Sequence, residues 1–359
     1  MIRSRSQGEM MKNVTPKKMR QGDEDDDPPP ASQASDVSIS STWSLTSSPP
    51  PPMSLNPAKH SLDFQQEVVI CRGLALLIVL FGLWWYDNLN YLVSLLWAFL
   101  RKKWWFQHDS FEPILASSCF FVYINLFRVV DCMSSRKILR YRIQKTQDMS
   151  AWTRSRDRMG REMLGYLLPL LAFDYFFPRR RLPEDPPALA QLLVEVVATV
   201  NLYDVFFFFS HILLHKNRQL YTMVHARHHT MSAVRACEAV RHTFVDGSLN
   251  VACSVLALNL VGSHPLSRAA HNIVLIYLLV ELHAGYDMPW MLHNICPLEL
   301  IGGPPRHDDH HRYGYCYYQK FGTYLDRAFG FEMNRHRCGD GTNALCCYYQ
   351  QVFTNKNND

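Results

Sequence analysis

Residues 211–229 read HILLHKNRQLYTMVHARHH, which contains two clusters of histidines close to the end of an apolar segment. The clustered residues are His211, His215, His225, His228 and His229. Residues three or four apart share one face of a helix, so each cluster is expected to present its imidazoles together. Imidazole binds transition metals without adding charge, and the stretch therefore predicts a metal centre.

A third cluster repeats the spacing His-x-x-His-His after a long apolar interval. The further histidines of the pattern are His242, His283, His307, His310 and His311. With 16 histidines in 359 residues, chance placement gives about 0.03 copies of His-x-x-His-His per chain. Two copies beside a His-x-x-x-His are therefore a specific signal, and all ten of these histidines are candidate metal ligands.

Apolar stretches of membrane-spanning character surround the clusters and make up much of the chain. They cover residues 73–100, 111–130, 163–177, 188–209, 251–260 and 269–282. About 20 apolar residues span a bilayer, and we expect 73–100 to form one helix with an interfacial extension. The predicted fold is an all-α integral membrane protein with about four transmembrane helices in hairpins. A cytosolic helical cap would hold the histidines, since the hairpin turned at 262–265 returns the chain to one side of the membrane.

The chain divides into four predicted regions. Residues 1–60 are rich in Pro, Ser and charge, and predict a disordered cytosolic tail. Residues 61–185 hold the first membrane helices and a basic loop, 186–335 the catalytic domain, and 336–359 a C-terminal tail. The arginines and lysines between 136 and 161 are typical of a cytosolic loop. A net charge of only +5 gives no indication of a nucleic-acid partner.

The number of imidazoles bears on the identity of the metal. Eight or more exceed the four to six ligands of a single ion, so they favour two metals. Structural zinc usually takes cysteine ligands, and carboxylate-bridged iron sites use Glu-x-x-His, which is absent. A pair of irons held by nitrogen ligands fits best, with Glu281, Asp287, Asp308 and Asp309 as acids that could offset the charge or fix imidazole tautomers.

Two further segments carry a family resemblance. Residues 281–290, ELHAGYDMPW, resemble a Glu-x-His-x-Gly-Tyr-x-x-Pro-Trp motif, and residues 324–330, YLDRAFG, resemble an Asp-x-x-x-Gly motif. Together with the histidine boxes, residues 196–330 resemble the membrane-bound fatty acid hydroxylase superfamily. Its members include sterol desaturases, sterol methyl oxidases, cholesterol hydroxylases and alternative squalene epoxidases.

This resemblance implies a non-haem centre of two irons that uses dioxygen. Electrons would come from NAD(P)H through a reductase and a b-type cytochrome, which would be separate proteins because no His-Pro-Gly-Gly haem signature occurs. The implied ligands are the eight boxed histidines and His283. His242 matches a further family histidine that is usually followed by Pro, whereas here Thr243 follows. The implied location is the endoplasmic reticulum membrane, with the histidines facing the cytosol.

The resemblance implies an oxygen-dependent oxidase of a membrane lipid. The segment around His283 favours a sterol or sterol precursor as substrate, by hydroxylation, methyl oxidation, desaturation or squalene-type epoxidation. A fatty-acyl or sphingoid-base hydroxylase is the alternative enzyme. A metal-binding membrane protein without catalysis is a third hypothesis. It is disfavoured because transporters place polar residues within their membrane spans, whereas the histidines here follow the apolar runs.

Overall fold

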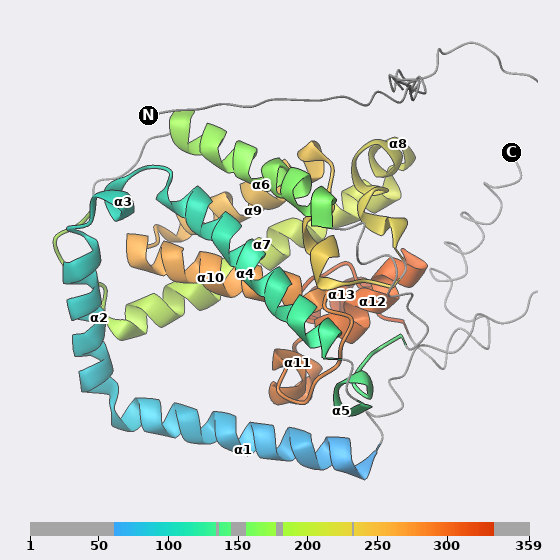
Figure 1. Cartoon of the computed structure of the whole chain (residues 1–359), viewed down its shortest axis with the longest axis horizontal. Helices are drawn as coiled ribbons and strands as arrows, with labels where there is room; N and C mark the ends of the chain where they lie inside the picture. Colours follow the sequence, from blue (N-terminus) through green and yellow to red (C-terminus); the bar gives the residue numbers. More distant parts are fainter. Residues whose placement is uncertain (1–60, 134–135, 145–155, 177–181, 232, 334–359) are drawn as a thin grey trace, which may run out of the picture. The chain divides into compact units, whose positions relative to one another are not determined.

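The computed structural model describes residues 61–133, 136–144, 156–176, 182–231 and 233–333. Within these ranges the named elements are all helices, and paired extended backbone is limited to the isolated bridges Arg142 with Tyr286 and Ile301 with Gly322. The predicted all-α fold is therefore confirmed for the described part of the chain (Figure 1). The predicted tails, much of the basic loop (145–155) and residues 179–181 lie outside the described residues.

Five helices are long and apolar enough to cross a membrane, where the sequence predicted about four. They are α1 (Leu62–Trp84), α4 (Phe111–Cys132), α7 (Leu189–Lys216), α9 (Phe244–Val261) and α10 (Pro265–Leu282). The last two reach 18 residues each because they begin ahead of the apolar runs. Thr243 caps α9 by accepting from the N–H of Asp246, and Pro265 occupies the first turn of α10.

The sequence predicted one helix with an interfacial extension over residues 73–100, and the structure divides this stretch between two helices. The stretch forms α1 and then α2 (Tyr86–Leu100), which meet at an angle at Trp85 (Figure 1). Trp85 has φ −100° and ψ 18°, outside the α-helical region, so the chain turns there. Most side chains of α1 are exposed, as expected for a helix that faces lipid.

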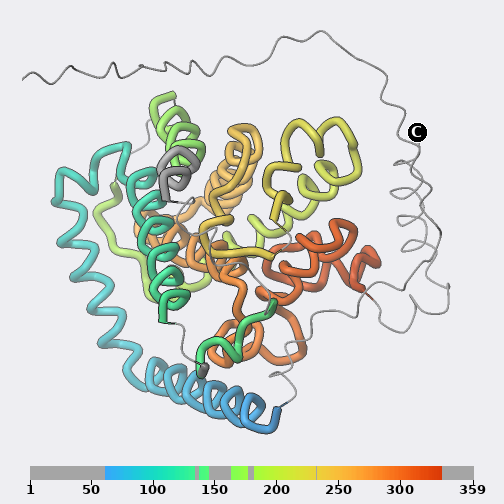
Figure 2. The backbone as a smooth tube through the Cα atoms, turned by 45° about the vertical axis from the view of Figure 1, so that its right-hand side comes forward, coloured from blue at the N-terminus to red at the C-terminus, as the bar shows by residue number. Residues whose placement is uncertain are grey.

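The other long helices form a bundle. α10 packs against α4 and α7, while α9 packs against α7 and against α6 (Arg156–Phe176). The two views agree that α9 and α10 lie among these neighbours (Figures 1 and 2). Buried side chains such as Phe120, Ile124, Phe207 and Val280 make up the apolar core between them.

Short elements cap the bundle and carry most of the histidines. They comprise α5 (Arg136–Leu139), α8 (Arg218–Leu220), a π-helical turn (Tyr221–His225), 3-10 turns (His228–Thr230, Ala236–Val240 and Pro297–Glu299), α11 (Leu292–Ile295), α12 (Gly303–Tyr313) and α13 (Tyr324–Phe329). The short helix α3 (Trp104–Gln107) lies elsewhere, beside the starts of α4 and α10. Because α10 contacts both α12 and the turn Ala236–Val240, this cap is attached directly to the bundle.

Candidate metal centre

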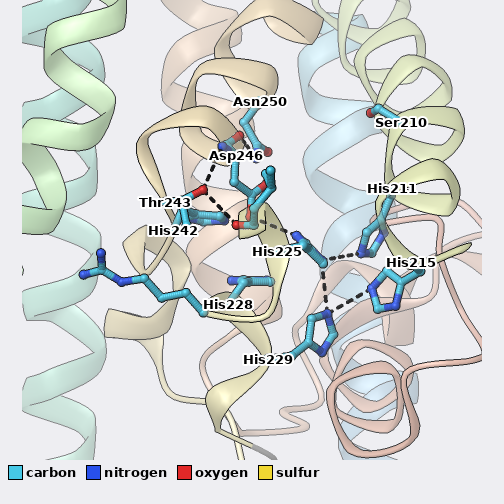
Figure 3. Close-up of polar contacts among 12 residues, drawn as sticks. Ser210, His211, His215, His225, His228, His229, His242, Thr243, Asp246 and Asn250 are labelled. Carbon is cyan, nitrogen blue, oxygen red and sulfur yellow. Dashed lines mark hydrogen bonds and ion pairs between the residues drawn. The ribbon is translucent and has the colours of Figure 1, made fainter. Parts of the chain in front are cut away.

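The first histidine pair lies where the sequence predicted it, on the last turns of α7. His211 and His215 are four residues apart, both are buried, and their ring centroids are 4.8 Å apart. After α7 ends, the side chain of Asn217 accepts from the N–H groups of Gln219 and Leu220 and starts α8. The chain therefore reverses and brings the second cluster back to the first (Figure 3).

The second cluster does not form the single helical face that its spacing predicted. A π-helical turn ends at His225, where Ala226 N donates to Tyr221 O at 2.7 Å, and a 3-10 turn begins at His228. This change of winding gives neighbouring residues different directions. His225 and His229 point toward the α7 pair, whereas His228 points elsewhere.

The third cluster lies on α12, which has Pro in its first turn. Gly314 ends the helix with φ +72°, a left-handed conformation that glycine adopts without steric cost. The three histidines again divide between two directions: His310 faces the α7 pair, and His307 and His311 face His228 and His283.

Two groups of imidazoles result, and in each the candidate ligand atoms lie within 4.8 Å of one another. The five-histidine group contains His211, His215, His225, His229 and His310. The four-histidine group contains His228, His283, His307 and His311. Nine of the ten predicted residues thus come together from three distant stretches of sequence, at a number suited to two ions.

The hydrogen-bond partners of His211 and His225 indicate that the two rings are oriented to bind a cation between them. His211 Nδ1 lies 2.8 Å from the Tyr318 carbonyl, and His225 Nδ1 lies 2.9 Å from Asp246 Oδ2. The carbonyl only accepts, as does Asp246 in its ionised form, so each ring then carries its proton on Nδ1 and has a lone pair on Nε2. The two Nε2 atoms nevertheless face each other at 3.1 Å. Opposed lone pairs at this distance repel, and a metal ion between them removes the repulsion. The donor set therefore fits a metal.

In the four-histidine group, Nε2 atoms also lie close together with lone pairs available for a metal. His283 Nδ1 donates to the Leu279 carbonyl at 2.7 Å, which leaves its Nε2 free to act as a ligand. That Nε2 lies 2.9 Å from His307 Nε2 and 3.5 Å from His228 Nε2. In the other group, His310 Nδ1 likewise donates to the Cys316 carbonyl at 2.7 Å. Its buried Nε2 has no hydrogen-bond partner among the described residues.

Burial keeps the imidazoles in the neutral form that binds metals. Removal from water lowers the pKa of His283 to about 3 and that of His310 to about 4. The same cause holds the pKa values of His225, His228 and His307 well below the usual 6.5. Neutral rings at physiological pH can each offer a lone pair to a cation.

His242 lies outside both groups. Its ring stacks on that of His228, with centroids 4.4 Å apart and an interplanar angle of 13°, and its Nδ1 is 3.3 Å from the Tyr166 hydroxyl. Thr243, which stands where the family pattern has Pro, caps α9 and donates its hydroxyl to the Val224 carbonyl beside a ligand candidate (Figure 3).

Three of the four acids expected near the ligands have other partners, and Asp246 was not predicted. Glu281 accepts from the Tyr277 hydroxyl, Asp287 contacts His293 and Asn294, and Asp308 accepts from Gln144. Asp246, which is completely buried, instead binds His225. An acid three residues after Thr243 also reads as an ordinary residue of a first helical turn, so sequence alone did not distinguish it.

Comparison with known proteins agrees with this geometry. Residues 196–331 match the family model described as fatty acid hydroxylase. That match covers all nine grouped histidines. The matched region belongs to the fatty acid hydroxylase superfamily. Together with the names of the relatives below, the match makes the chain an oxidoreductase, and the apolar helices make it a multi-pass membrane protein.

Several proteins of this superfamily are similar to the chain. A cholesterol 25-hydroxylase-like protein of Danio rerio is 29% identical over 62% of this chain and 90% of its own length. Cholesterol 25-hydroxylase of Homo sapiens is 29% identical over 66% of this chain and 88% of its own length. A Dictyostelium discoideum protein that carries the name of a methylsterol monooxygenase is 31% identical over 40% of this chain and 53% of its own. No solved structure matches the chain.

Proposed function

We propose that this protein is an oxygen-dependent oxidase of a membrane lipid, with a sterol or sterol precursor as substrate. The observation that carries the proposal is the convergence of nine imidazole nitrogens into two adjoining groups within a hydroxylase domain. The names of the relatives support a sterol rather than a fatty-acyl or sphingoid-base substrate.

The five-histidine and four-histidine groups would each hold one iron, and the pair would supply the activation of dioxygen for attack on an unactivated carbon. The protein supplies position and a dry site. Carbonyls of Leu279, Cys316 and Tyr318 hold protons on Nδ1 atoms and so direct three Nε2 lone pairs inward. Eight of the nine grouped rings are buried, which limits the access of water.

Two electrons per turnover must come from outside the chain, since mono-oxygenation with dioxygen consumes them. A b-type cytochrome and its NAD(P)H-dependent reductase are the proposed donors. The proposed location is the endoplasmic reticulum, with the histidine-bearing cap on the cytosolic side, where such donors could reach it.

Expression in yeast strains that each lack one step of sterol synthesis tests the substrate. We expect a new oxidised sterol, or restored sterol synthesis in one strain, when lipids are profiled by mass spectrometry. His228→Ala should abolish the product because it removes a ligand of the four-histidine group. His108→Ala, at an exposed histidine outside both groups, should leave the product unchanged.

Two results would contradict the proposal. Unchanged sterols with new hydroxylated fatty acids or sphingoid bases would assign the alternative substrate. Unchanged lipids in every strain, despite good expression and two bound irons, would argue against lipid oxidation altogether.

A further inference from the structure

Residues 316–322, called here the carbonyl segment, run beside the five-histidine group. The carbonyl of Cys316 accepts from His310 Nδ1 at 2.7 Å, and that of Tyr318 accepts from His211 Nδ1 at 2.8 Å. Two of the five candidate ligands thus take their ring orientation from the main chain of one short segment. Whatever fixes the segment therefore fixes those two rings.

The backbone between the two carbonyls is strained. Tyr317 has φ +54°, in the left-handed region that residues other than glycine rarely adopt. Its N–H donates to the Phe331 carbonyl at 3.1 Å. A conformation of this kind persists only where surrounding contacts hold it, so the carbonyl segment requires anchors.

Asp204 of α7 is the first anchor. Its carboxylate, 1% exposed, accepts four hydrogen bonds from the segment. The donors are Gln319 Nε2 at 2.9 Å and the N–H groups of Lys320 at 3.0 Å, Phe321 at 3.1 Å and Gly322 at 2.7 Å. A carboxylate is the small group that can accept four donors at once, and a neutral amide in its place would turn a donor toward other donors.

Asp326 of α13 is the second anchor and is equally buried. Its two oxygens accept from the N–H groups of Tyr318 at 2.9 Å and Gln319 at 3.1 Å. Lys320 adds a third tie, because its amino group donates to Tyr203 Oη at 3.0 Å and to Asn250 Oδ1 at 2.6 Å. The segment is thus held on both sides of the Tyr318 carbonyl.

We propose that Asp204 and Asp326 are positioning residues for the five-histidine group, acting through the carbonyl segment. The proposal rests on the proposed function in one respect, that each group holds a metal. It predicts that loss of either anchor weakens metal binding by the five-histidine group and not by the four-histidine group. The reason is that His283 of the four-histidine group takes its orientation from Leu279 within α10 and not from this segment.

The test is iron binding by Asp326→Asn and Asp204→Asn in the full-length protein in detergent, with Asp87→Asn at an exposed site as the matched control. We expect the affinity of one iron site to fall by about 10–100-fold while the other stays unchanged. Iron per chain should fall toward half, and Mössbauer spectra should lose one component and keep the other. Tyr317→Gly should retain both irons, since glycine adopts φ +54° without strain.

Gly322→Ala serves as a milder variant if either Asn variant fails to fold. An added Cβ there would lie 2.5 Å from Gln319 Nε2, so it would disturb the segment without removing an anchor. Selective loss of one iron would support the proposal. Retention of both irons with unchanged affinity in the Asn variants, or parallel loss of both in Gly322→Ala, would overturn it. A wild-type protein that binds two irons but oxidises no lipid would contradict the proposed function alone.

Discussion

Asp246 contacts a candidate ligand directly, through His225 Nδ1 at 2.9 Å. A carboxylate partner raises the basicity of an imidazole and fixes its tautomer. Asp246→Asn keeps an acceptor but loses the charge, whereas Asp246→Ala loses both. We therefore expect iron affinity to fall in the order wild type, Asn, Ala, with a total loss of about 10–100-fold.

Competition with a chelator of known iron affinity measures this series, and Asp87→Ala at an exposed site is the control. Equal affinities for the wild type and the Ala variant would contradict the role of Asp246.

At this scale the sequence predicted which histidines come together, but not the direction of each ring. Spacing identified all nine residues that converge. It also included His242, whose ring stacks on His228 outside both groups, because spacing does not determine where a ring lies in the fold. The Cys316 and Tyr318 carbonyls could not be predicted, since main-chain acceptors leave no trace in residue identity.

α12 carries three of the nine histidines, and Gly303 at its start admits no side chain. The residue has φ +65°, and an added Cβ would lie 2.3 Å from Cγ of the buried His293 ring. Gly314 at the other end has φ +72° but no neighbouring atom within 4 Å of an added Cβ. Alanine at Gly314 should therefore cost about 1 kcal/mol from conformation alone, whereas alanine at Gly303 must also displace α12 or the ring.

We expect Gly303→Ala to lower the melting temperature more than Gly314→Ala and to reduce iron per chain, because the displaced helix carries ligands of both groups. Thermal unfolding and iron analysis of both variants measure the effect. Equal effects of the two substitutions would show that packing at Gly303 is unimportant.

Helix ends that the apolar runs or turn residues mark clearly in the sequence were predicted, whereas features decided by tertiary packing were not. The end of α7 at the first histidine pair and the turn at 262–265 agree with the sequence. The position of the bend at Trp85 and the π-helical turn before His225 were not predicted. Both reflect a choice among helical windings that differ little in energy and are decided by tertiary packing.

For the whole molecule, the buried imidazoles predict a pH dependence of the metal-free protein. The pKa values of His283 and His310 are about 3 and about 4 in the folded chain, against 6.5 when unfolded. The unfolded chain therefore binds more protons below pH 6.5. The stability from these two groups is complete above pH 6.5 and is lost progressively as the pH falls from 6.5 toward about 4 for His310 and about 3 for His283.

Melting temperatures of the metal-free protein in detergent should accordingly decrease as the pH is lowered from about 7.5 to about 4.5. The iron-loaded protein should resist acid further, since bound metal blocks protonation of its ligands. A metal-free melting temperature that is constant or rises over this range would contradict the burial of neutral rings.

Local patterns predicted the helical class, whereas the cap depends on contacts between distant residues. Gln144 donates to Asp308, 164 residues later, and Asp204 holds the carbonyl segment from more than 100 residues away. Such pairings join segments with no shared periodicity, so only the fold reveals them. The extended pairing of Arg142 with Tyr286 likewise joins the beginning of the basic region to the stretch after His283.

The central claim, that the two histidine groups each bind one iron, is tested most directly by measuring the number of irons per chain and the type of their ligand atoms. Protein loaded anaerobically with ferrous iron and freed of excess should hold two irons per chain, in the two histidine groups. X-ray absorption should show nitrogen and oxygen neighbours without sulfur, because cysteine belongs to neither group. One iron or none per folded chain, or sulfur among the ligands, would contradict the two-metal centre.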